Sequence, residues 1–198
     1  MSTALDRSHR ARQLVLRQQT GNQLGRLLAS LPSFDQAGVE AYHEPALVAV
    51  TAGQRAAATT AAGYAGLRVP RPRPRRPVDV DAALARSGLL VTPDSPSVVA
   101  PAVHGMALVS QGLTFAAALQ AAQSMAYALS SMDMQSALGV GLEEGTSAAG
   151  GRITGYRKEL SPDACAMCQE SDGVIYESAD DVPFHERDTC SVAPVYGE

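Results

Sequence analysis

Residues 165–190 read CAMCQESDGVIYESADDVPFHERDTC. This stretch carries all 3 cysteines of the chain, and with His185 they form the pattern C-x2-C-x16-H-x4-C. Zinc takes four sulfur or nitrogen ligands in a tetrahedron, and two short ligand pairs separated by a loop supply them with little strain. The sequence therefore predicts a structural Zn2+ site formed by Cys165, Cys168, His185 and Cys190.

Two other arrangements of the cysteines compete with a metal site. One disulfide would leave an odd cysteine. The sequence also shows no charged N-terminal region followed by an apolar run, the pattern that would indicate export to an oxidising compartment. A redox-active C-x2-C should open a helix within a βαβ unit, whereas Pro162 and Asp163 precede this pair. A cluster of reactive or unpaired thiols remains the alternative to zinc.

Short strands are expected around the cysteines. Residues 152–160 alternate apolar and charged side chains, which is typical of an edge strand. Residues 174–176 follow the turn signal Asp172-Gly173 and predict a second strand, and residues 192–196 predict a third. Such a module needs no large hydrophobic core, because metal binding supplies roughly 10 to 16 kcal/mol in small zinc peptides.

Helices are expected before this module. Leucines near helical spacing predict a helix over residues 2–31, with Pro32 as its stop. A second helical segment covers residues 34–62, and Pro45 should start a new helix or kink the old one. Together the two segments predict an antiparallel helical pair.

Residues 95–132 contain no Asp, Glu, Lys or Arg. The length would suffice for a membrane span, but Ala, Ser and Gln prevail over Leu and Ile, and two prolines and Gly112 interrupt the stretch. We therefore expect two buried helices, over residues 98–110 and 114–132. The glycine-rich sequence GVGLEEG at residues 139–145 predicts a helix end and a hinge before the C-terminal module.

Charge is divided unevenly along the chain. Residues 1–76 hold 11 arginines and 4 acidic residues, whereas residues 77–198 hold 5 basic and 16 acidic residues. Residues 68–77, RVPRPRPRRP, predict an extended polyproline segment. It reads as a semi-rigid solvated linker or, alternatively, as a contact for phosphates or an acidic partner through its arginines. These arginines are Arg68, Arg71, Arg73, Arg75 and Arg76.

The predicted fold class is mainly α, a helical body with a small C-terminal zinc-stapled module of short β-strands. We expect four parts in the chain. They are an N-terminal helical segment (residues 1–67), an Arg/Pro-rich linker (68–94), an apolar helical segment (95–150) and the Cys/His module (151–198).

The C-terminal segment resembles that of the phage Mu F-type minor head proteins, especially versions from phages of actinobacteria. That family shows an arginine ahead of a C-x2-C, a loop with a glycine and a tyrosine, a histidine, and a final cysteine before a proline-ended strand. The matching residues are Arg157, Cys165, Cys168, Gly173, Tyr176, His185, Cys190 and Pro194. Many relatives end in Cys-x-Cys, but Val192 stands at the second position here, so Asp188 is an alternative to Cys190 as the fourth ligand.

This resemblance covers about a quarter of the chain, and the helical region before it fits the family's plan without a specific motif. It implies a structural minor capsid protein of a tailed phage, associated with the portal and capsid interior. The implied partners are portal protein and major capsid or scaffold proteins, with packaged DNA as a further candidate, and neither a membrane nor a small-molecule substrate is expected. The implied locations are the virion and, during assembly, the host cytoplasm.

Two other classes of function remain open. A zinc-containing nucleic-acid-binding protein is one, but the many carboxylates around the cysteines would repel phosphates. A zinc enzyme is the other, but nucleoside deaminases place H-x-E before P-C-x-x-C, the reverse of the order here. Four protein ligands also favour a closed structural site, since catalytic zinc keeps an open position. We therefore expect no enzyme.

Overall fold

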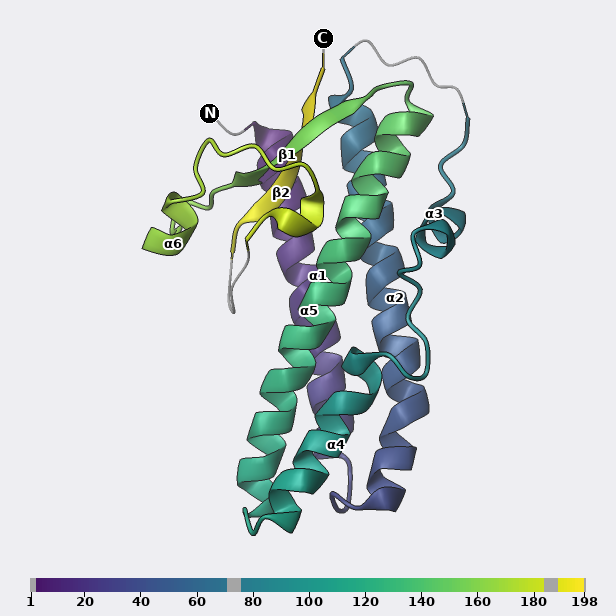
Figure 1. Ribbon diagram of the computed structural model, residues 1–198, viewed down its shortest axis with the longest axis vertical. Coiled ribbons are helices and arrows are strands. Elements are labelled where there is room, and N and C mark those ends of the chain that lie inside the picture. The colour runs from purple at the N-terminus through teal and green to yellow at the C-terminus, as the bar shows by residue number, and fades with distance from the viewer. Residues whose placement is uncertain (1–2, 71–75, 184–188, 198) are drawn as a thin grey trace. The chain divides into compact units, whose positions relative to one another are not determined.

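The structure, a computed structural model, describes residues 3–70, 76–183 and 189–197. It is mainly helical with a small two-stranded antiparallel sheet at the C-terminus (Figure 1), which confirms the predicted class in outline. The elements are α1 (Ala4–Ala29), α2 (Gln36–Arg68), α3 (Val80–Arg86), α4 (Pro96–Ser110), α5 (Phe115–Ala148), β1 (Ile153–Glu159), α6 (Ala166–Gln169), a 3-10 turn η1 (Ala179–Asp181) and β2 (Ser191–Tyr196).

The chain divides into two compact units. The first unit comprises residues 1–15, 55–89 and 135–198, and the second comprises residues 16–54 and 90–134. Helices α1, α2 and α5 contribute residues to each unit. The cysteine-bearing segment therefore belongs to the same unit as the beginning of α1 and the ends of α2 and α5.

The second unit has a core of leucines, valines and alanines. Its uncharged stretch, residues 95–132, buries Val98 and Ala102 of α4 together with three alanines of α5 spaced four residues apart. Gly105 of α4 lies so close to the ring of Phe34 that an added Cβ would come within 2.5 Å of it. Helices are thus present over both predicted stretches, but each is buried on one face rather than throughout. None of the described helices combines the length and apolar character that a membrane crossing needs.

Two helices are longer than predicted. The α2 helix continues through Pro45, which removes one backbone donor without ending the helix. The predicted hinge at residues 139–145 is wrong, because α5 runs through it to Ala148. Gly141 in this stretch lets α5 pack closely against α2, because a Cβ at this position would clash with the carbonyl oxygen of Ala58. The backbones of α5 and α2 therefore touch in the first unit.

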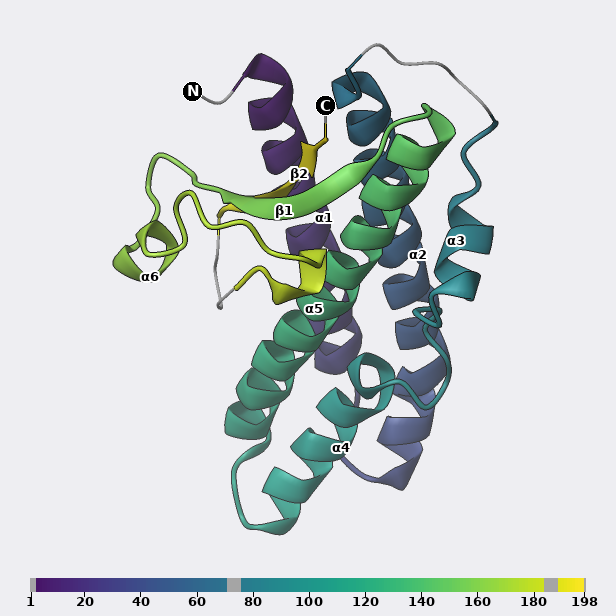
Figure 2. The same ribbon diagram turned by 45° about the horizontal axis from the view of Figure 1, so that its top comes forward.

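The sheet pairs the two ends of the C-terminal segment. Strand β1 runs antiparallel to β2, with Tyr156 opposite Pro194, and Figure 2 shows the two strands side by side. The strands predicted at residues 152–160 and 192–196 are confirmed. The strand predicted at residues 174–176 is reduced to one bridge, in which Tyr156 and Tyr176 exchange two backbone hydrogen bonds of 2.8 Å.

This sheet packs on helices rather than standing alone. Tyr156 of β1 and Val192 of β2 are buried in one cluster with Leu138 and Leu142 of α5, and Ala61 of α2 joins it. The sheet therefore shares its hydrophobic core with α5 and α2 and has no large core of its own within the described residues. The same cluster includes Ala179 and Val182, which belong to the connection between the two strands.

The close approach of α2 and α5 predicts the effect of an added methyl group. In Gly145→Ala the new Cβ would meet the carbonyl oxygen of Ala62, which forces the two helices apart. We expect a loss of roughly 1 to 3 kcal/mol in the free energy of unfolding, measured by urea denaturation.

A matched control is Gly63→Ala on α2, where a Cβ meets nothing within 4 Å. Alanine is the better helix former, so this variant should gain about 0.5 to 1 kcal/mol. Equal effects of the two substitutions would contradict the close contact.

Candidate metal centre and buried carboxylates

Cys165 and Cys168 lie at the beginning of the short helix α6. Cys165 has extended backbone angles at the N-cap, and Cys168 is buried one turn later. Their Sγ atoms are 3.7 Å apart. A disulfide would bring them to about 2.05 Å, whereas two thiolates bound at about 2.3 Å to one tetrahedral zinc lie about 3.8 Å apart. The two sulfurs are not joined in a disulfide, and their spacing fits two ligands of one metal ion.

Cys190 immediately precedes β2 and is fully buried. Its Sγ accepts the backbone N–H of Ser161 at 3.4 Å and lies 3.8 Å from the Ser161 hydroxyl. Ser161 precedes Cys165 by four residues, and Thr189 contacts both Ser161 and Asp163 through its hydroxyl. Cys190, the predicted fourth ligand, is therefore hydrogen-bonded to the turn that leads into the cysteine pair, and an N–H donated to sulfur orients a thiolate.

The predicted ligand set is described only in part. His185 and the alternative ligand Asp188 lie outside the described residues. Within residues 3–70, 76–183 and 189–197, no three His, Cys, Asp or Glu side chains gather as metal ligands. The donor chemistry of the cysteine pair nevertheless suits zinc, because soft thiolates prefer it.

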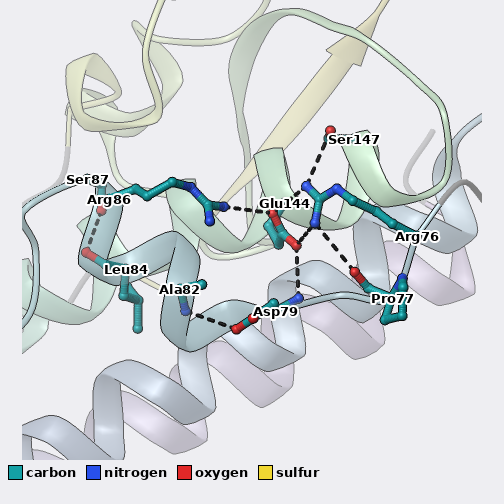
Figure 3. A network of polar contacts seen from close by, with 9 residues as sticks. All are labelled: Arg76, Pro77, Asp79, Ala82, Leu84, Arg86, Ser87, Glu144 and Ser147. Carbon is teal, nitrogen blue, oxygen red and sulfur yellow. Dashed lines mark hydrogen bonds and ion pairs between the residues drawn. The ribbon is translucent and has the colours of Figure 1, made fainter.

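A buried carboxylate in the same unit was missed by sequence reasoning. Glu144 of α5 has a side chain only 3% exposed. Both of its oxygens accept from the guanidinium of Arg76, one also accepts the backbone N–H of Asp79 at 2.9 Å, and Arg86 lies 3.5 Å away (Figure 3). The hydrogen bonds from Arg76 outweigh burial and hold the pKa of Glu144 below its usual range.

Asp6 of α1 is a second buried carboxylate. It accepts the backbone N–H of Thr3 at 2.7 Å and the hydroxyl of Tyr64 at 2.9 Å, and Arg68 lies 3.5 Å away. Burial raises the pKa of Asp6, but these hydrogen bonds outweigh it and leave the pKa lowered. Glu159 of β1 has a raised pKa because it is buried and faces the charge of Asp6.

Two of the arginines predicted to contact DNA form ion pairs with these buried carboxylates. Arg68 has Asp6 as an intramolecular partner, and Arg76 has Glu144. The arginines between them, Arg71, Arg73 and Arg75, lie outside the described residues. Nothing in the sequence pattern distinguished the two flanking arginines from the three inner ones, because their partners are distant in the chain.

A groove of about 480 Å3 lies between the end of α5 and β1 in the first unit. Tyr156 and Glu143 meet there through a 2.8 Å hydrogen bond from the phenol to the carboxylate. Burial, followed by that hydrogen bond, raises the pKa of Tyr156. The phenol therefore stays protonated at neutral pH and acts as a donor. The cysteines do not line this groove.

His9 of α1 is buried, and neither ring nitrogen has a hydrogen-bond partner among the described residues. Its ring stacks on Tyr64 with centroids 4.0 Å apart and planes within 8°. Burial lowers its pKa to about 4, although the charge of Asp6 opposes the shift. At neutral pH His9 is therefore an uncharged aromatic side chain of the core.

No protein-family model, curated protein or solved structure matches the chain.

The lowered pKa of His9 predicts acid sensitivity. The unfolded chain takes up a proton on this side chain near pH 6.5 and the folded chain only near pH 4. The free energy of unfolding should therefore fall by roughly 3 kcal/mol from His9 alone as the pH drops through this window. Urea denaturation at each pH measures the effect.

His9→Phe keeps a ring against Tyr64 and removes the titrating group, so its stability should depend less on pH in this window. Glu159 and Asp6 remain in both proteins, and the difference between the two curves isolates His9. Parallel curves for the two proteins would show that His9 is not buried in its neutral form.

Proposed function

We propose that residues 160–190 are stapled by a structural Zn2+ ion bound to Cys165, Cys168, His185 and Cys190. The observation that carries the proposal is the 3.7 Å separation of the two Sγ atoms, which matches two corners of a tetrahedral thiolate site. The backbone N–H of Ser161 donates to the Sγ of Cys190, and hydrogen bonds of this kind orient metal ligands.

A zinc ion in this position would stabilise fold rather than perform catalysis. Four protein ligands leave no coordination position for water, and binding of the ion opposes unfolding of the segment that carries the ligands. The described connection has short elements, α6 and η1, and several exposed carboxylates. Ala179 and Val182 of this segment are buried in the cluster with Leu138 and Leu142, so the zinc cross-link would chiefly order the part around α6.

We further propose that the protein is a minor capsid protein of a tailed phage, associated with the portal and the capsid interior. The support is the residue pattern shared with the Mu F-type family. Its described members have structural roles in the first unit: Arg157 lies on β1, Gly173 has a positive φ of 76°, and Pro194 lies in β2 opposite Tyr156. Tyr176 bridges to β1.

Contact with packaged DNA would depend on the inner arginines. Arg68 and Arg76 already face buried carboxylates, so Arg71, Arg73 and Arg75 are the residues proposed to meet phosphates. The C-terminal segment is an unsuitable surface for DNA, because residues 160–183 contain six carboxylates and no basic residue. Portal or capsid protein remains the proposed partner for that segment.

Zinc binding gives a direct biochemical prediction. The purified chain should contain about one zinc per molecule, and Cys165→Ser should lose the metal and become sensitive to protease within residues 160–183. Strands β1 and β2 should stay protected, since they share a core with α2 and α5. Metal analysis and mass spectrometry of the fragments measure both effects.

Met167→Ser is the matched control, because Met167 lies between the two cysteines and its side chain is 58% exposed. It should keep the zinc and the protease resistance. A wild-type chain without zinc, or a Cys165→Ser variant as resistant as the wild type, would refute the staple.

The capsid role predicts the location of the protein. Mass spectrometry of purified phage particles should find the chain in every preparation, and the chain should be retained with the portal when tails are removed. Its absence from particles of a phage that expresses it during infection would refute the capsid role and leave the zinc proposal standing.

A further inference from the structure

The segment from Arg76 to Leu89 forms a strap in the first unit. It follows the proline-rich segment directly and contains one short helix, α3 (Val80–Arg86), capped at its start by Asp79. Seven residues are too few for a helix to be stable by itself in water. The strap therefore depends on contacts with other elements of the unit.

One set of these contacts is ionic. The guanidinium of Arg76 binds both oxygens of Glu144, the backbone N–H of Asp79 donates to the same carboxylate, and Arg86 approaches it at 3.5 Å (Figure 3). Arg76 also lies 3.5 Å from the hydroxyl of Ser147 on α5. Charge-assisted bidentate pairs are the strong ones among protein hydrogen bonds. A single carboxylate thus holds both ends of α3.

The other set is apolar and small. Leu84 of the strap is fully buried against Ala58 of α2 and Ala137 of α5, with Val80 and Val140 packed partly at its edge. One leucine burying itself on alanines contributes roughly 2 kcal/mol. This contact alone does not hold fourteen residues against their conformational entropy.

We propose that the strap is a latched cover whose latch is the Arg76–Glu144 ion pair. When the pair is broken, residues 77–89 detach as one local unit and uncover the face of α2 and α5 around Ala58, Ala137 and Val140. The rest of the first unit stays folded, because its sheet and helices share a separate cluster of buried residues. This device does not involve the cysteines and stands apart from the proposed zinc site.

Hydrogen exchange on the full chain tests the latch. Glu144→Gln keeps the shape of the side chain and removes its charge. We expect the amides of residues 80–89 to exchange about 10- to 100-fold faster than in the wild type, at unchanged protection of β1. Asp81→Asn is the control, since it removes the other ion pair of α3, the exposed contact of Asp81 with Arg55 of α2, and it should change exchange little.

Arg76→Gln is a second variant that leaves Arg86 beside Glu144 and removes a guanidinium that is itself 42% exposed. It should accelerate exchange over the same residues. Unchanged exchange of residues 80–89 in the Arg76 variant would overturn the latch. Acceleration that extends equally to residues 153–159 would also overturn it, because Glu144 would then stabilise the whole unit instead of the strap.

Discussion

The contact between the backbones of α2 and α5 is the constraint on which the first unit depends. Gly141 and Gly145 present no side chain toward Ala58 and Ala62, so the two helices meet at their main chains. This contact fixes the rotation of α5 about its own axis. In this orientation Leu138 and Leu142 lie in the cluster of buried residues under the sheet, and Glu144 binds Arg76 of the strap.

The orientation of α5 in turn positions the sheet that follows it. Gly150 has a φ of 78°, a conformation that favours glycine, and it turns the chain from the helix into β1. Strand β1 then pairs with β2, and the segment that carries the cysteines connects the two strands along the chain. The proposed zinc ion would act on that segment alone, while hydrophobic packing holds the strands that begin and end it.

Features of the sequence with local causes could be predicted. The helices of the uncharged stretch and both strands of the sheet follow from spacing, prolines and alternation, and the cysteine pair follows from its own two-residue gap. The glycines of residues 139–145 misled the prediction, because a glycine that permits helix contact resembles a glycine that ends a helix. The partner that distinguishes them, α2, is about eighty residues away in the chain.

The strap and its carboxylate could not be predicted for the same reason. Glu144 stands in a sequence of glycines and small residues that gives no sign of burial, and the residues that pair with it are 65 and 68 positions away. The short helix α3 within the predicted linker was missed as well, since its stability comes from Leu84 and Glu144 rather than from its own seven residues. Long-range pairing of this kind leaves no periodic signal.

Cobalt substitution tests the central claim of a tetrahedral thiolate site most directly. Co2+ bound in place of zinc by Cys165, Cys168, Cys190 and His185 should give the strong visible absorption and sulfur-to-metal charge transfer of a four-coordinate thiolate complex, and added Zn2+ should abolish both. Weak absorption typical of a six-coordinate ion with oxygen ligands, or no cobalt binding by the reduced protein, would contradict the claim.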